Sequence, residues 1–93
     1  MTSTPLFLPV KAAYFEAFRT GMKTIEYRRG SRWNARTCFI GREVVLSCGY
    51  GTQRRLRGRI THFELSAQPP AEWTKIYDTG GIAACITIEL DGN

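Results

Sequence analysis

The sequence predicts a single small α+β domain, in which about five to six strands form a strongly curved mixed sheet or barrel with two short helices packed on it. The chain of 93 residues is long enough for one hydrophobic core. Its apolar share of 43% and charged share of 23% are ordinary for a folded globular protein. The order of the expected elements, strands with two short helices among them, fits such a domain. No linker or repeat divides residues 1–93, so we expect one domain.

The beginning of the chain predicts a strand followed by a helix. Residues 6–10 form an apolar run that we expect to be a short edge strand stopping at Pro9, because proline cannot donate to a ladder. Aromatic residues at helical spacing, with alanines among them, predict a helix over residues 11–20. Gly21 follows at the position where a glycine with positive φ ends a helix at little cost.

A third element follows this helix. Residues 24–28 alternate and are rich in β-forming residues, which predicts a strand. The alternation places Glu26 and Arg28 on the same face of that strand. Residues 29–37 contain glycine, serine and asparagine among arginines, and we expect them to form a loop that carries Trp33.

The second half of the chain predicts three further strands and a second helix. Residues 43–48 are typical of a buried strand, and residues 54–65 of a long strand with its arginines on one face. Residues 69–77 suggest a short helix with proline in its first turn. Residues 82–90 predict a closing strand.

The charge balance favours a polyanionic partner. The formal net charge is +5 and the pI is near 9.5, and ten of the thirteen cationic residues are arginine. Arginine is suited to bidentate contacts with phosphate and to stacking on bases. The alternative is a basic surface that serves solubility alone, because net charge also controls solubility.

The cysteines and the N-terminus bear on cofactors and location. Three cysteines are an odd number, and none has C-x-x-C spacing, which argues against a disulfide framework and against a zinc site. Cys48 and Cys85 lie in apolar runs and are expected to be small buried hydrophobes. The first ten residues resemble neither a signal peptide nor a membrane span. We therefore expect a cytoplasmic protein with no metal, no cofactor and no membrane partner.

Charged and aromatic residues gather most densely between Gly21 and Arg36. This stretch holds a lysine, a carboxylate, two aromatic residues and four arginines between two apolar segments. Such a gathering at a junction between elements is more often a binding surface than part of a core.

Five short motifs together resemble the ASCH domain family, whose fold is similar to that of PUA domains. They are Leu8-Pro9-Val10-Lys11, Tyr14-Phe15, Gly21-x-Lys23-Thr24-x-Glu26-Tyr27-Arg28, Trp33-x-x-Arg36 and Gly49-Tyr50-Gly51. The resemblance is strongest over residues 8–36 and weaker through Tyr50. It implies a PUA-like mixed β-barrel with helices packed on it, and a cleft between the first helix and the barrel lined by the lysine motif.

The resemblance also implies a function. The family looks like an RNA-binding one, in which some members are ribonucleases. Another branch consists of amidohydrolases that act on N4-acetylcytidine nucleosides through a lysine followed three residues later by a nucleophilic threonine. Here Lys23 matches the lysine, but Glu26 occupies the position of the threonine. A carboxylate can activate a water but does not provide the acyl-enzyme route of that branch.

Two sets of residues are therefore candidates for function. The expected catalytic residues are Lys23, Glu26 and Tyr27, with Lys23 as a base or cation and Glu26 orienting it. The expected nucleic-acid-binding residues are Arg28, Arg29, Arg32, Trp33, Arg36, Tyr50, Arg54, Arg55 and Arg57. Guanidinium groups hold phosphates and aromatic faces stack on unpaired bases, so the partner would be single-stranded or structured RNA, or a modified nucleoside.

Simpler interpretations remain open for each group. Lys23 and Glu26 could form a surface salt bridge worth roughly 0–1 kcal/mol. Trp33 could pack in the core, and the later arginines could be a solvated strand face that discourages aggregation. His62 is the only histidine, which excludes a ribonuclease with two catalytic histidines. A third function is a basic adaptor that binds a protein partner through Trp33 and Tyr50, and the oligomeric state is open.

Overall fold

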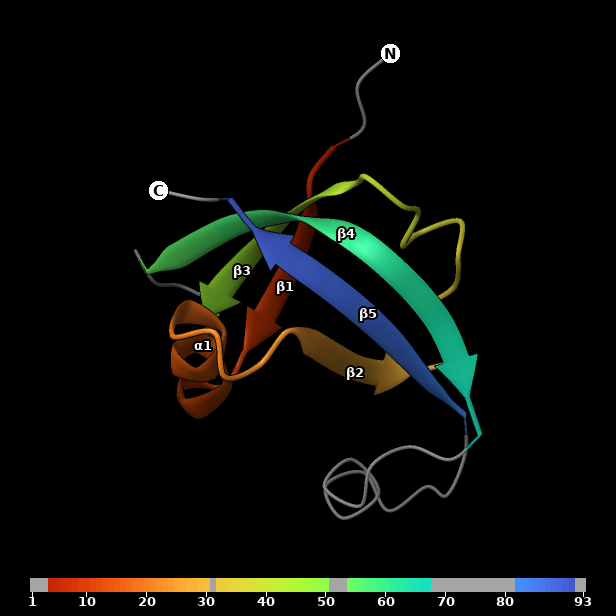
Figure 1. The fold of residues 1–93 in the computed structure, drawn as a ribbon, viewed down its shortest axis with the longest axis horizontal. Helices are drawn as coiled ribbons and strands as arrows, with labels where there is room; N and C mark the ends of the chain where they lie inside the picture. The colour runs from red at the N-terminus through yellow and green to blue at the C-terminus, as the bar shows by residue number, and fades with distance from the viewer. Residues whose placement is uncertain (1–3, 31, 51–53, 68–81, 92–93) are drawn as a thin grey trace.

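A computed structural model describes residues 4–30, 32–50, 54–67 and 82–91, and they form one mixed sheet with a helix against it (Figure 1). The elements in chain order are β1 (Leu6–Val10), α1 (Ala12–Arg19), β2 (Ile25–Arg29), β3 (Glu43–Cys48), β4 (Arg55–Ser66) and β5 (Ala83–Leu90). The strand order is β1-β3-β4-β5-β2, and only the β1–β3 pair is parallel. The sheet curls into a half-barrel, which confirms the coarser prediction of a small barrel-like α+β fold.

The sequence located the described strands to within about two residues. β1 differs from the prediction in one respect, since it continues through Pro9 to Val10 in register with Ser47 and Cys48. The expectation that the strand stops at Pro9 is wrong, because β1 lies at the edge of the described sheet, where one side of the strand needs no ladder donor. The helix predicted over residues 69–77 lies outside the described residues.

Helix α1 forms where the sequence predicts it, with Phe15 and Phe18 buried on its inner side. It has no side-chain cap at Lys11, so its first turn depends on packing more than on capping. Its C-terminus is defined by Gly21 at φ 83°, after which the Lys23 amide donates to the Ala17 carbonyl over 3.0 Å. This turn returns the chain toward β2 and sets the position of Lys23.

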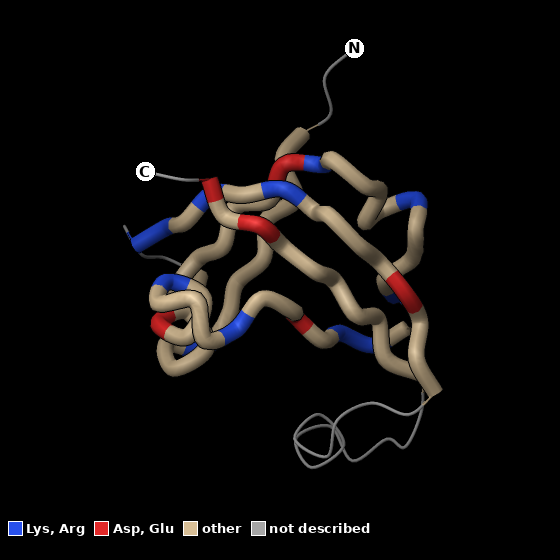
Figure 2. The backbone as a smooth tube through the Cα atoms, in the orientation of Figure 1, with Lys and Arg blue, Asp and Glu red and all other residues tan. Residues whose placement is uncertain are grey.

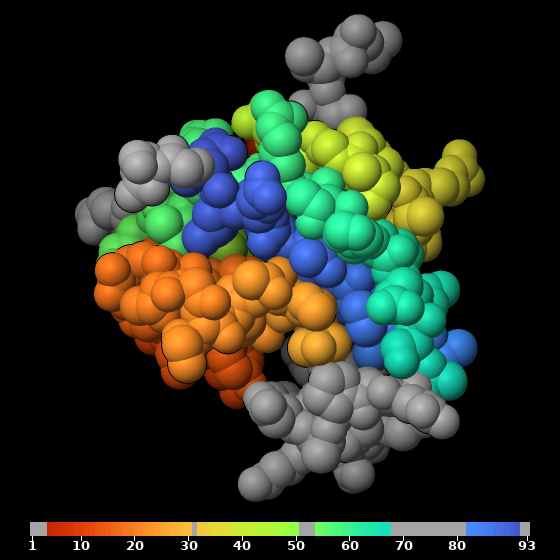
Figure 3. Space-filling model, viewed as in Figure 1, coloured from red at the N-terminus to blue at the C-terminus, as the bar shows by residue number. Residues whose placement is uncertain are grey.

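The hydrophobic core lies on the inner face of the curled sheet, and Phe15 and Phe18 of α1 are part of it. Figure 3 shows the orange segment that contains α1 packed directly against the sheet. Leu8, Leu46, Ile60 and Ile86 are completely buried there, one from each of four strands. A register shift between Ile60 and His62 marks a bulge in β4. Bulges increase the bend and twist of a strand, and this one lies where β4 and β5 arch over the core in Figure 1.

The curl brings the two edge strands close together. β1 and β2 occupy opposite ends of the strand order, yet a side chain of β2 reaches a backbone carbonyl of β1. We call this junction between the edges of β1 and β2 the seam. No helix in the described part of the chain has both the length and the apolar character needed to cross a membrane.

Candidate nucleic-acid interface

A charged cluster occupies the seam, and the arginine at its centre holds the two edges of the sheet together. The Arg28 Nε donates to Glu26 Oε2 over 2.8 Å, and its Nη2 donates to the Pro9 carbonyl over 2.7 Å. Glu26 and Arg28 share the inner face of β2, as the alternation predicted. Glu26 is only 6% exposed and lies in register with the buried Ile86 of β5. We refer to Lys23, Glu26 and Arg28 as the seam cluster.

Trp33 covers the seam cluster from the chain that follows β2. The guanidinium carbon of Arg28 lies 5.3 Å from the centroid of the Trp33 ring, a distance at which a cation is attracted to an aromatic face. The ring is half-buried and packs against the core. Packing against the core is one of the two roles that the sequence allows for Trp33. A role for Trp33 or Arg28 in binding RNA stays a prediction.

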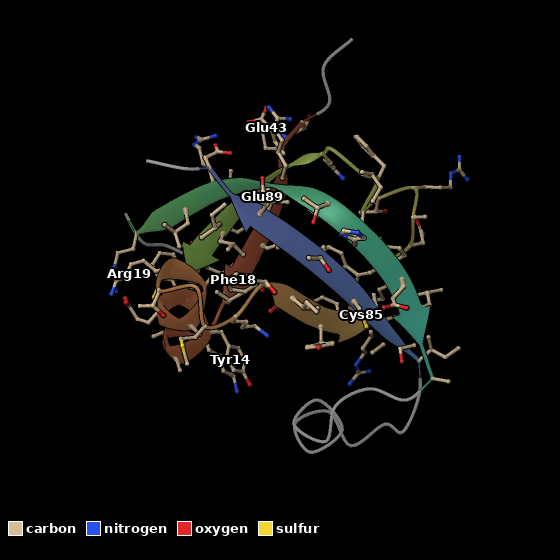
Figure 4. All side chains as sticks on the ribbon, viewed as in Figure 1. Tyr14, Phe18, Arg19, Glu43, Cys85 and Glu89 are labelled. Atoms are coloured by element: carbon tan, nitrogen blue, oxygen red, sulfur yellow. The ribbon has the colours of Figure 1, made fainter. Side chains whose placement is uncertain are left out.

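Lys23 is enclosed by aromatic rings beside the same carboxylate. Its Nζ lies 3.9 Å from Glu26 Oε1 and 5.1 Å from the ring centroids of both Tyr14 and Tyr27. The Phe18 ring is 5.5 Å away. The structure thus brings together all three predicted catalytic residues, Lys23, Glu26 and Tyr27. It adds two aromatic residues of α1 (Figure 4): Tyr14, which belongs to a motif of the family resemblance, and Phe18, which the sequence placed only on the helix.

Burial is the main influence on the pKa of the Glu26 carboxyl. Removal from water raises the pKa of the Glu26 carboxyl above its ordinary value of 4.5, although Arg28 and Lys23 act in the opposite direction. A raised pKa makes the carboxylate a stronger proton acceptor than a free glutamate. The same contacts leave two cations around one carboxylate, so the fully ionised seam cluster carries one net positive charge.

The chain from residue 27 to residue 42, which we call the basic segment, follows directly from the seam cluster. Arg29, Arg32 and Arg36 are exposed along it. The Asn34 side-chain oxygen accepts hydrogen bonds from the amides of Arg36 and Thr37, over 2.9 and 3.1 Å. Such local bonds stabilise a turn without a strand or helix around it.

Two further contacts attach the basic segment to the body of the protein. The buried Cys38 is part of the core. Arg42 donates to the Thr4 and Thr37 carbonyls over 2.9 and 2.7 Å. The exposed arginines are therefore displayed on a segment with an anchored beginning, middle and end.

The second run of arginines lies on the outer face of the sheet. Arg55, Arg57 and Arg59 are exposed while the residues between them face inward, which confirms the predicted alternation. In register, Arg59 stands between Glu43 of β3 and Glu89 of β5. Opposite charges across neighbouring strands stabilise a sheet, and they reduce the net positive charge of this face. These arginines are on the opposite face of the sheet from Glu26 and Arg28.

Tyr50 and Arg54 lie beside the ends of β3 and β4. Tyr50 comes two residues after the end of β3 and is exposed. A role for Tyr50 in binding RNA stays a prediction. Arg54 pairs with Glu16 of α1, and its guanidinium carbon lies 4.9 Å from the Phe15 ring centroid.

The remaining polar candidates have local surroundings. Among the described residues, no three His, Cys, Asp or Glu side chains gather closely enough to hold a metal ion. His62 is exposed on β4, with its Nδ1 3.2 Å from the Thr61 hydroxyl. Burial raises the pKa of the Cys38 and Cys85 thiols. Cys85 is buried as predicted, whereas Cys48 is only half-buried.

Arg28→Ala is expected to destabilise the protein strongly, because it opens the seam and leaves the buried Glu26 with only Lys23 as a cationic neighbour. Breaking a buried ion pair from one side costs about 3 kcal/mol in the free energy of unfolding. Urea denaturation measures the loss. The exposed Arg32→Ala should stay within about 0.5 kcal/mol of wild type. If Arg28→Ala is as stable as this control, Arg28 does not hold the seam.

The raised pKa of Glu26 predicts a pH dependence of stability. The folded state holds the Glu26 proton more tightly than the unfolded state, so this contribution is fully present below pH 4.5 and is lost as pH rises through the folded pKa. Wild type should therefore lose stability relative to Glu26→Gln over that window. Urea denaturation of both proteins at several pH values measures the difference, in which Glu16, present in both, cancels. The prediction is contradicted if the stability of wild type, relative to that of Glu26→Gln, stays constant or increases as pH rises.

Comparison with known proteins does not assign a family to this chain. A scan against protein-family models finds no match. A search of curated proteins finds no matching relative. A function for the chain therefore has to be inferred from its own contacts and charges.

Proposed function

We propose that the protein is an RNA-binding domain of the ASCH family with a PUA-like barrel, and that it binds single-stranded RNA through the exposed arginines of the basic segment. The motifs around Lys23 support the family, and the half-barrel covered by α1 is compatible with it. The RNA contacts would come from Arg29, Arg32 and Arg36, with phosphate oxygens as their partners.

The observation that carries this proposal is the location of the net charge. The basic segment contains five arginines and no acidic residue. The rest of the chain contains eight cationic and eight acidic residues. The sixteen residues of the basic segment therefore carry a charge equal to the whole formal net charge of +5. Charge that serves solubility alone does not need to be concentrated in one segment, whereas a phosphate-binding surface requires positive charges close together.

The contacts of these arginines divide them by role. Arg28 and Arg42 bond to carbonyl and carboxylate groups of the protein itself. The side chains between them are exposed on an anchored turn. Because an anchored segment loses little conformational entropy on binding, its arginines are suited to hold phosphates at low cost. We infer that Arg28 supports this surface from beneath and that the exposed Arg32 and Arg36 contact the ligand.

Removal of two exposed arginines should weaken RNA binding and reduce its salt dependence. Each phosphate contact on a single strand contributes roughly 0.7 to the slope of log affinity against log salt, so Arg32→Ala/Arg36→Ala should lower the slope by about 1.4. Affinity at low salt should fall at least about fivefold. Fluorescence anisotropy with a labelled ten-nucleotide RNA across a salt series measures both quantities.

The matched control removes the same charge from the outer face of the sheet. Arg57→Ala/Arg59→Ala deletes two arginines, and Arg59 is opposed by acidic residues of neighbouring strands. We expect it to change affinity by no more than about twofold, since compensated surface charges contribute little. Equal losses in the two double variants, or no binding by wild type at low salt, would overturn the assignment to the basic segment.

A second candidate function is hydrolysis at the seam cluster, either of RNA or of an N4-acetylcytidine nucleoside. The observation in its favour is a buried carboxylate of raised pKa beside an ammonium group, a combination that occurs at catalytic sites. Glu26 would accept a proton from a water, and Lys23 would stabilise the negative charge that develops on the attacked group. The bond from Arg28 and the low exposure of Glu26 oppose this role, because they restrict access of a substrate water.

Turnover assays separate this candidate from binding alone. Labelled RNA and N4-acetylcytidine are each incubated with wild type, Lys23→Ala and Glu26→Gln, and products are resolved by chromatography. Hydrolysis at the seam cluster predicts turnover by wild type and a loss of at least about a hundredfold in both variants. Absence of turnover, or variants as active as wild type, would remove the catalytic candidate and leave the binding proposal intact.

A further inference from the structure

We propose that a second site, at the carboxyl ends of β1 and β3, binds a single nucleotide unit, with its base against Tyr50 and its phosphate near Lys11. The site is an open hollow of about 240 Å³ lined by Pro9, Val10, Lys11, Gly49 and Tyr50. The choice of a nucleotide as the ligand rests on the proposed RNA function. The unit could belong to an RNA strand or be a free nucleotide, because both present the same base and phosphate.

Strand pairing builds the hollow. β1 and β3 run parallel, so their carboxyl ends meet, with Val10 in register with Cys48. The Gly49 amide donates to the Val10 carbonyl over 3.0 Å, and the buried Ser47 hydroxyl donates to the Gly49 carbonyl over 2.6 Å. Gly49 has φ 77°, which a side chain would make unfavourable. The peptide that carries Tyr50 is therefore fixed against β1.

Tyr50 itself is 81% exposed, although it is a large aromatic residue on this fixed turn. The aromatic rings of α1 are buried or half-buried in comparison. An exposed ring on an anchored backbone, beside an apolar hollow, offers a face on which any base can stack, at roughly 1–3 kcal/mol per base. Pro9 and Val10 supply the apolar surface for the rest of the base.

The charges around the hollow suit a phosphate. Lys11 is an exposed member of its lining. Figure 2 shows basic positions gathered around α1 and the adjoining start of β4. The acidic residue of α1, Glu16, is engaged by Arg19 and Arg54. The net charge around the hollow is thus positive, which favours an anionic ligand over an uncharged apolar one.

The geometry also distinguishes this hollow from the seam cluster. Pro9 belongs to both, since its carbonyl accepts a hydrogen bond from Arg28 while the residue also lines the hollow. Tyr50 and Lys11 are not members of the seam cluster, and neither is part of the catalytic candidate. Their substitution therefore tests the hollow without removing a residue of the seam.

The experiment measures nucleotide binding by amide chemical shifts of ¹⁵N-labelled protein. The free probes are AMP, GMP, CMP and UMP together with the matching nucleosides, and the RNA probe is a ten-nucleotide oligouridylate. We expect nucleotides to shift the amide signals of Gly49 and Val10. Tyr50→Ala should weaken this binding about tenfold, whereas Tyr50→Phe, which keeps the ring, should stay within about twofold of wild type. Lys11→Ala should weaken nucleotides more than nucleosides.

The outcomes separate the failure of this inference from failure of the proposed function. If no nucleotide shifts Gly49, or if Tyr50→Ala binds as wild type does, the hollow is not a nucleotide site, whatever the oligouridylate result. If Arg32→Ala/Arg36→Ala leaves oligouridylate binding unchanged while Tyr50→Ala abolishes it, the basic segment fails and the hollow stands. Binding of free nucleotides without binding of the oligouridylate would assign the hollow to a free nucleotide and overturn its use by RNA.

Discussion

The Arg28 guanidinium is the contact on which the described sheet most depends. A five-stranded sheet that curls halfway around a core leaves two edges, and an edge with unpaired backbone groups is a liability. Here one side chain spans the gap, because Arg28 donates to Glu26 on its own strand and to the Pro9 carbonyl on the other edge. The planar, five-donor guanidinium can serve both acceptors at once, which an ammonium group cannot do with the same geometry.

This contact explains why a carboxylate is tolerated in the interior. Glu26 is removed from water, and burial of an unpaired charge would cost several kcal/mol. Arg28 and Lys23 offset part of that cost. The part of the desolvation cost that they do not offset raises the pKa of the carboxyl. The aromatic rings around Lys23 add to the same balance by attracting its ammonium group. The seam cluster is therefore first a structural unit, and its location between α1 and the sheet is what makes it a candidate for chemistry.

Three groups of described arginines differ in what they contact. One group is internal, as Arg28 and Arg42 are, and bonds to the protein itself. A second, represented by Arg59, lies among acidic residues on the outer face of the sheet. The third is exposed on the basic segment, where the excess charge of the chain resides. Composition counts all three alike, although the third is better suited to a polyanionic ligand than the other two by both charge and exposure.

The amino-acid sequence by itself determined the elements and their faces: the helix ended by Gly21, the strand with Glu26 and Arg28 together, and the arginine face of β4. These features follow from local periodicity and backbone preference, which act between near neighbours in the chain. Tertiary structure alone decided that Arg28 closes the seam, that Lys23 lies among the rings of α1, and that Pro9 contributes both to the seam and to the hollow beside Tyr50. Those outcomes depend on strand order and curl, which bring residues from separate strands together or move them apart, and local pattern carries no information about that distance.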